Sequence, residues 1–440
     1  MAKKGSNTKK TTKTKSQQAK DVGIFAGAVA TVGAVASKSA GKGKSAKQKK
    51  QIRSLAFVLV LAIIVCGVLF YMDIAPFNFE INGDFFKYYS YTPIVPSNTL
   101  GNKTVSDFRL HVIDVNQGDC MLLELPDGKT MLIDGAKKSN TIATGIVDYL
   151  LSDQIGLKDS SGKVTLDYVM LTHTDADHCG SLDDVIKSNK IDVLNVYRPL
   201  IMSKYADDPL KSYAVQNNLS YSTITTTVYS KFVQAVAEED GCQTFYNYGD
   251  NKLEGAGYVM YFYNPTPEMY VDIKTAADKN NVSPVIIIDV CGRKIALTGD
   301  ADKEQELNFI SQVSDAKYGL DESFVDVDIL KVAHHGGRES STEEFLKVVK
   351  PEYALISVGD GNSYGHPTTE VLSRLQNVGC ANVYRTDKHG SIVVTVSSAE
   401  GVINVDTTKK SNTYATRFND YLRANFDRLT LLARVKYILF

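Results

Sequence analysis

Short apolar runs separated by turn residues begin at Phe108 and continue to about residue 405. Runs that are rich in β-branched residues and bounded by Gly, Pro, Asn and Asp are typical of strands. The pattern predicts strands at 108–115, 120–125, 130–134, 167–172, 192–197, 258–263, 285–291, 294–298, 327–332, 352–358, 383–384, 391–396 and 402–405. It predicts helices at 141–151, 181–188, 303–313, 342–349 and 368–378. Strands in both halves with helices between them indicate a layered α/β sandwich.

Residues 200–255 depart from this pattern because they are rich in Tyr and Ser and show few clear periods. We interpret this segment as an insertion, and insertions near a site often form lids or substrate walls. The alternating elements around it predict one domain at residues 106–406.

Leu55 to Met72 is a stretch of 18 residues without a charge, which is long enough to cross a bilayer as a helix. We therefore expect a transmembrane helix at 54–73 and a spacer at 74–105. A cleaved signal peptide is the alternative, but its basic region would be about fifty residues long and no A-x-A cleavage site follows.

Charge is distributed unevenly along the chain. Residues 1–53 hold 14 of the 49 Lys and Arg residues, and of the 50 acidic residues they hold Asp21 alone. This basic tail cannot bury a core, so we expect it to be disordered and attracted to anionic lipid. The positive-inside rule then places the N-terminus in the cytoplasm and the acidic domain outside the cell membrane.

The C-terminal segment 407–440 ends in a stretch, Arg417 to Phe440, with an apolar face and basic residues around it. Such a helix can lie on a membrane, and the alternative is that it packs onto its own domain. The lipid bilayer, reached through 54–73 and the basic tail, is the expected partner. The sequence points to no protein partner.

Residues with metal-ligand chemistry collect in turns that follow apolar runs. His173, Asp175, Asp177 and His178 lie in one such turn, directly after the run 167–172. Burying two imidazoles and two carboxylates so close together is unfavourable unless a cation shares them. This turn therefore predicts a divalent metal ion or a pair of them.

Three further turns carry similar groups. Asp300 follows the strand predicted at 294–298, His334 and His335 follow the next strand, and His366 lies shortly after the strand that ends at residue 358. Sites in α/β folds are assembled from the ends of several strands. We therefore expect these turns to meet in one site.

The order of these motifs resembles that of metallo-β-lactamase-fold hydrolases. His173-x-Asp175-x-Asp177-His178 is similar to the HxHxDH signature of that fold, with Asp175 in place of the middle His. The other motifs in the same order are Asp114–Asp119, Leu132–Gly135, Leu297–Asp300, Leu330–Gly336 and Tyr364–Pro367. The resemblance covers about residues 106–406, is closest to the soluble domain of ComEC-type competence proteins, and implies an αββα sandwich. Phosphorylcholine esterases of the same fold show a similar pattern. The chain has one predicted membrane helix instead of a many-helix channel, so DNA translocation is not implied.

By this resemblance the site would hold two divalent ions, either Zn²⁺ or Mn²⁺. The implied ligands are His173 and Asp175 for one ion, Asp177 and His178 for the other, Asp300 as a bridge, and His334 or His335 on the second ion. The family usually has another His between the first cluster and the bridging Asp, and this chain has none. The first ion therefore has fewer nitrogen ligands, and an oxygen-rich set accepts Mn²⁺ as readily as Zn²⁺.

Two such ions can lower the pKa of a bound water to about 7 and clamp both oxygens of a phosphoester. Asp177 and His366 are the candidate catalytic residues, with His366 contacting phosphate or protonating the leaving group. We expect Asp134 to orient a His ligand, and Lys331 and Arg338 to bind phosphate oxygens.

These residues favour a membrane-anchored, metal-dependent phosphodiesterase with DNA as a candidate substrate. The alternatives are a metallohydrolase of a phosphocholine ester, thioester or lactam, and a non-catalytic binding module on the same scaffold. Asp175 argues against lactam chemistry, and the retained ligand set argues against the binding module. The acidic domain is unfavourable for a nuclease because it repels phosphate.

Overall fold

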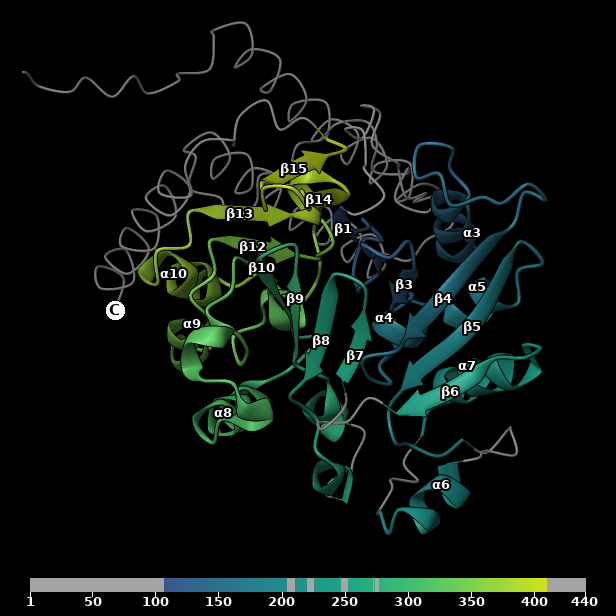
Figure 1. Ribbon diagram of the computed structural model, residues 1–440, viewed down its shortest axis with the longest axis horizontal. Coiled ribbons are helices and arrows are strands. Elements are labelled where there is room, and N and C mark those ends of the chain that lie inside the picture. Colours follow the sequence, from purple (N-terminus) through teal and green to yellow (C-terminus); the bar gives the residue numbers. More distant parts are fainter. Residues whose placement is uncertain are drawn as a thin grey trace, which may run out of the picture. The chain divides into compact units, whose positions relative to one another are not determined.

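The computed structural model describes residues 107–203, 210–219, 225–246, 252–271, 273 and 277–409 (Figure 1). The segments expected to be a basic tail, a transmembrane helix and a spacer, and nearly all of 407–440, lie outside the described residues. Among the helices that are described, none combines the length and the apolar character needed to cross a membrane.

Two mixed sheets account for the strands of the described domain. The first sheet has the order β15 (Ile403–Thr407), β14 (Ile392–Val396), β1 (Phe108–Val112), β2 (Met121–Glu124), β3 (Thr130–Ile133), β4 (Val164–Met170), β5 (Ile191–Arg198), β6 (Gln243–Tyr246). The second has the order β13 (Asn382–Arg385), β12 (Tyr353–Ile356), β11 (Ile329–Lys331), β10 (Arg293–Leu297), β9 (Ile286–Val290), β8 (Tyr258–Phe262), β7 (Lys252–Gly255).

Each sheet combines a parallel half with an antiparallel half. Strands β3 to β6 are parallel neighbours in the first sheet, as are β10 to β13 in the second. Parallel neighbours end at the same edge of a sheet, where α/β folds place their ligands. The residues that follow β3, β4, β10 and β11 are therefore brought to two such edges.

Apolar side chains between the two sheets form the central core. Leu110 and Met131 of the first sheet belong to the same buried cluster as Met260, Ile288 and Leu355 of the second. The outer face of the first sheet packs on α3 (Asn140–Leu150), α5 (Leu182–Ile186) and α7 (Thr227–Glu238). The outer face of the second packs on α8 (Lys303–Ser314), α9 (Glu343–Val349) and α10 (Thr369–Asn377), as Figure 1 shows. The layers follow the expected αββα order.

Short helical turns complete the described elements. They are α4 (Ala176–Cys179), α6 (Leu210–Gln216), α11 (Thr386–His389), and the 3₁₀ turns η1 (Pro267–Val271), η2 (Ala277–Val282), η3 (Lys317–Gly319), η4 (Glu322–Val325) and η5 (Ala333–Gly336). The turn α4 contains His178 and comes shortly after β4, and η5 contains His334 and His335 and comes just after β11.

The segment 200–255, interpreted as an insertion, contributes to both sheets in its described part. Its strand β6 pairs with β5 at the edge of the first sheet, and β7 pairs with β8 at the edge of the second. Its helix α7 buries Phe232 against the first sheet. The described part is therefore built into the sandwich, and a lid function for the remainder stays a prediction.

Glu306 of α8 holds the start of α9 in place. The backbone N–H groups of Ser341 and Thr342 and the Thr342 hydroxyl all donate to its buried carboxylate. Burial raises the pKa of Glu306 from its ordinary 4.5 to about 7, and these three donors oppose the shift only in part. The folded state therefore keeps a proton that the unfolded chain releases between these two pH values, so stability falls as pH rises through that window.

We expect Glu306→Gln to flatten this part of the pH dependence. A shift of this size corresponds to a loss of about 3 kcal/mol of stability in the wild type between pH 4.5 and 7, and an amide does not titrate. Urea unfolding at pH 5 and pH 7.5 measures how much the free energy of unfolding changes with pH in the wild type and in Glu306→Gln. Glu339→Gln, on the surface, is the control. Equal slopes in wild type and Glu306→Gln would contradict the expectation.

Candidate metal centre

Asp134 orients the two histidines of the first turn. Its carboxylate accepts hydrogen bonds from the Thr172 backbone N–H (2.8 Å), the Thr172 hydroxyl (2.7 Å) and Nδ1 of His178 (2.7 Å). Because the Thr172 hydroxyl donates to Asp134, its oxygen is left to accept from Nδ1 of His173, which lies 3.1 Å away. Both imidazoles are thereby held with Nε2 as the free nitrogen, which is the tautomer a metal ligand requires.

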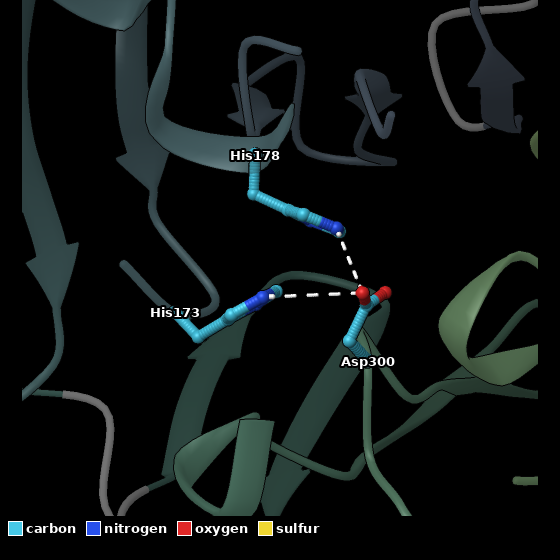
Figure 2. Close-up of side chains that lie close together, drawn as sticks. All are labelled: His173, His178 and Asp300. Carbon is cyan, nitrogen blue, oxygen red and sulfur yellow. Dashed lines mark ion pairs between the residues drawn. The ribbon is translucent and has the colours of Figure 1, made fainter. Parts of the chain in front are cut away.

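These Nε2 atoms converge on one carboxylate oxygen. Figure 2 shows the rings of His173 and His178 directed at Asp300, with Nε2 to Oδ2 distances of 3.9 and 3.2 Å. From the other sheet, Nε2 of His334 and of His335 lie 3.8 and 3.6 Å from the same oxygen. Asp300 therefore occupies the central position that the resemblance implies for a bridging ligand.

The turn that carries His334 and His335 has an unusual backbone. Both residues are left-handed, with φ of 49° and 54°, and Gly336 follows with φ of 82°. Consecutive left-handed residues other than Gly are strained, and strain of this kind concentrates at functional sites. The His334 backbone N–H donates to the carbonyl of Gly299, which ties this turn to the residue before Asp300.

The two adjacent histidines are held differently. His335 is buried, its Nδ1 donates to the carbonyl of Ser357 (2.9 Å), and its Nε2 lies 3.5 Å from Oδ2 of Asp177. The side chain of His334 is about one third exposed. The sequence alone does not distinguish which of the two is the ligand, and the anchored Nδ1 of His335 matches the way metal-ligating histidines are usually supported.

The carboxylates of the first turn lie at the rim of the cluster. Oδ2 of Asp175 is 4.0 Å from Nε2 of His173, and both Asp175 and Asp177 are partly exposed. The loop before β2 contacts this turn directly: the Asp119 N–H donates to the Asp177 carbonyl. Only Gly fits at position 118, where φ is 125° and a Cβ would meet that carbonyl oxygen.

The donor set fits divalent ions. The Nε2 atoms of His173, His178 and His335 and Oδ1 of Asp300 are buried, and none makes a hydrogen bond of acceptable geometry. Leaving a buried polar atom unpaired costs about 1–3 kcal/mol, so four such atoms in one cluster need a shared partner. Subsets that include His173/His178/Asp300 and Asp177/His178/His335 bring their ligand atoms within 4.8 Å of one another.

The charges in the cluster depend on each other. Burial raises the pKa of the Asp300 carboxyl, but His178 and His335 outweigh burial and hold that pKa well below its usual range. The carboxylates have the opposite effect on the imidazoles. Burial lowers the pKa of His335, yet Asp300 and Asp119 raise it to about 10, and the pKa of His178 is likewise raised well above its ordinary value. The carboxylates thus require positive charge nearby, which either protons or metal ions can supply.

Asp119 and Lys331 form a buried ion pair that was not expected from the sequence. Nζ of Lys331 lies 2.7 Å from Oδ2 of Asp119, Oδ1 of Asp119 lies 3.3 Å from Nδ1 of His335, and both side chains are fully buried. This corrects the expectation that Lys331 binds phosphate oxygens, because its ammonium group is shielded from solvent and neutralised. The place of Lys331 beside the histidine turn was the basis for expecting a phosphate contact, and nothing in the local sequence marks Asp119 as its partner.

The remaining predicted residues lie around the cluster. His366 is half-buried, and its ring centroid is 5.6 Å from that of His334. Burial, together with His334 and His335, lowers the pKa of His366 to about 4. Arg338 is exposed and pairs with Glu370 at 2.7 Å. Phosphate contact by Arg338 stays a prediction.

We expect Asp134→Asn to weaken metal binding by about 10- to 100-fold, the usual effect of removing such a support. The amide N–H₂ would face Nδ1 of His178 and shift its proton to Nε2, the nitrogen directed at Asp300. Equilibrium dialysis of Mn²⁺ and Zn²⁺ measures the change, and Asp148→Asn on the exposed face of α3 is the control. Unchanged affinity in Asp134→Asn would contradict this role.

Residues 113–241 match the model of the Metallo-beta-lactamase superfamily. ComE operon protein 3 of Bacillus subtilis (strain 168) is 27% identical over 315 residues, which cover 68% of this chain and 34% of that protein. Competence protein ComA of Neisseria gonorrhoeae is 23% identical over 285 residues, 65% of this chain and 33% of that protein. The chain thus spans about a third of the length of these curated relatives.

Among solved structures, the metallo-beta-lactamase fold protein YhfI from Bacillus subtilis aligns with 68% of this chain and 100% of its own, at 12% identity and a TM-score of 0.36.

Proposed function

From the premise that this chain is a metallo-β-lactamase-fold protein similar to ComEC-type competence proteins, we propose that it is a metal-dependent hydrolase of phosphodiesters. The observation that supports the proposal most directly is the convergence of four imidazoles on Oδ2 of Asp300. Carboxylates at positions 175, 177 and 300 make the donor set rich in oxygen. Such a set suits Zn²⁺ or Mn²⁺ and the hydrolysis of phosphoesters.

The residues that would hold the ions come from both sheets. They are His173, Asp175, Asp177, His178, Asp300, His335 and, at the exposed side, His334. Bound divalent ions supply Lewis acidity, which lowers the pKa of water and stabilises negative charge on phosphoryl oxygens.

The surrounding side chains orient the metal ligands, the substrate and the attacking water. Asp134 and Thr172 hold the imidazoles of His173 and His178 with Nε2 directed inward. His366 lies at the open side, beside His334, where its ring can contact a phosphoryl or leaving-group oxygen. Asp177, partly exposed between the two turns, can orient the attacking water.

The test uses the purified full-length chain after chelation has removed its metal. Single-stranded DNA, bis(p-nitrophenyl) phosphate and p-nitrophenyl phosphorylcholine are assayed with added Mn²⁺ or Zn²⁺. We expect metal-dependent turnover of the first two substrates, and its loss in Asp177→Ala. Bound metal without turnover of any ester would indicate a binding module instead, and turnover of the choline ester alone would assign a different substrate class.

We also propose that residues 54–73 anchor the chain in a membrane, with the basic tail on anionic lipid at the cytoplasmic face and the domain outside. The support is the uncharged stretch from Leu55 to Met72 and the positive charge that precedes it. Protease added to intact cells should cleave the domain and leave the tail protected. A domain protected from protease in intact cells would contradict this orientation.

A further inference from the structure

An exposed aromatic side chain stands beside the open side of the candidate metal centre. Tyr364 lies in the loop between β12 and α10, and 66% of its surface is exposed. Its ring stacks against that of His366, with centroids 5.7 Å apart and planes inclined by 29°. The His366 ring lies 5.6 Å from that of His334 and 6.4 Å from that of His335. A row of rings therefore leads from solvent to the histidines around Asp300.

The loop that carries Tyr364 is braced. Oδ1 of Asn362 accepts from the backbone N–H groups of Tyr364 (3.2 Å) and His366 (3.0 Å). The amide group of Asn362 donates to the carbonyls of Gly359 and His366, at 3.0 and 2.7 Å. At its start, the Gly359 N–H donates to Oε1 of Gln117, which joins the loop to the first sheet. The backbone that carries Tyr364 is therefore fixed, so binding a ligand on its ring costs little conformational entropy in this loop.

We propose that Tyr364 is a stacking platform for the nucleobase next to the scissile phosphate, and that it selects base-bearing phosphodiesters over base-free ones. The inference rests on the proposed function and deepens it. One ring face is backed by His366, and the large exposed fraction shows that the ring serves no core packing. A flat aromatic face next to a phosphate-binding centre matches the way proteins bind single-stranded nucleic acid, in which each base stacks on an aromatic side chain.

The geometry favours an unpaired base over two other ligands. In a duplex the base faces are covered by neighbouring base pairs, so a single ring cannot stack on them unless the base is unstacked. A quaternary ammonium group is held by a cage of several aromatic faces, whereas Tyr364 presents one open face. A single-stranded nucleic acid is therefore the ligand that this surface fits.

The test compares two short oligo-dT strands that bind the Mn²⁺-loaded full-length chain. Both have phosphorothioate linkages to slow cleavage, and they differ at one central position, which carries either 2-aminopurine or an abasic sugar. Fluorescence anisotropy measures the affinity for each strand, and quenching of 2-aminopurine reports stacking directly. We expect the wild type to bind the base-bearing strand about 5- to 100-fold more tightly and to quench its fluorescence.

The variants separate stacking from a structural role of the loop. Tyr364→Ala should remove the preference and the quenching while it leaves the affinity for the abasic strand and the melting temperature unchanged. Tyr364→Phe, which keeps the ring, should retain both. The proposal is overturned if the wild type binds both strands equally or binds neither, or if Tyr364→Ala keeps the preference. It is also overturned if Tyr364→Ala loses only the hydrolysis of p-nitrophenyl phosphorylcholine.

This test is independent of catalysis. A chain that shows the base preference but hydrolyses no ester would refute the proposed function and retain Tyr364 only as a stacking platform for a bound nucleobase. A chain that hydrolyses bis(p-nitrophenyl) phosphate but shows no base preference would support the proposed function and refute the role of Tyr364.

Discussion

Asp300→Asn is expected to lower metal-dependent hydrolysis by about a thousandfold or more. Oδ2 of Asp300 lies within 4 Å of the Nε2 atoms of four histidines: His173, His178, His334 and His335. Among the described residues, no other carboxylate is shown to lie close to as many imidazoles. An amide carries no charge to balance the ions and has one oxygen instead of two. A thousandfold slower reaction corresponds to the loss of about 4 kcal/mol of transition-state stabilisation.

The measurement combines rate with metal content. Initial rates on bis(p-nitrophenyl) phosphate are followed across a Mn²⁺ titration, and bound metal is counted by mass spectrometry after dialysis. Asp315→Asn, which removes an exposed carboxylate after α8, is the matched control and should behave as wild type. Full activity and full metal content in Asp300→Asn would refute its bridging position.

Lys331→Met is expected to lower the free energy of unfolding by about 3–5 kcal/mol, the cost of leaving one member of a buried ion pair uncompensated. Asp119 would lose the ammonium group at 2.7 Å while it stays fully buried. Burial alone raises the pKa of the Asp119 carboxyl, and it is chiefly Lys331, together with His335, that holds this pKa well below its usual range. Urea unfolding at neutral pH measures the loss.

Two further variants isolate the ion pair. Arg338→Met removes a cation from the exposed turn nearby and should change stability little, because surface ion pairs contribute at most about 1 kcal/mol. The double variant Asp119→Asn/Lys331→Met should recover part of the loss, because no buried charge is then left unpaired. Unchanged stability in Lys331→Met, with a raised KM for substrate, would restore the phosphate-binding role first expected from the sequence.

Much of the fold could be predicted from local patterns. The apolar runs that begin at Phe108 correspond to the strands from β1 to β15 except β6 and β7, which lie in the segment 200–255, and helical periodicity located α3, α8, α9 and α10 within a few residues. The spacing of apolar residues reflects which face of a strand or helix is buried, so it can be recognised from the sequence alone. Turns rich in His and Asp after such runs could be expected to meet, because parallel strands end at one edge of a sheet.

The partners of individual side chains could not be predicted in this way. Lys331 and Arg338 are both basic residues beside the same histidine turn, yet one is buried against Asp119 and the other is exposed and paired with Glu370. Asp119 lies before β2 of the first sheet and Lys331 in β11 of the second, so their contact depends on how the two sheets pack. Nothing within a few residues of either position encodes that packing.

The same distinction holds at the candidate metal centre. By itself, the sequence determined which chemistry is present: imidazoles and carboxylates in turns after strands, with Asp175 where the resembled fold has His. Only the tertiary structure decided that Asp300 lies among four imidazoles, that His335 is anchored while His334 is partly exposed, and that Tyr364 stands open beside His366. The reason is physical. Local sequence sets the periodicity of each element, whereas burial and charge partners arise from contacts between segments far apart in the chain, which exist only once the two sheets have packed.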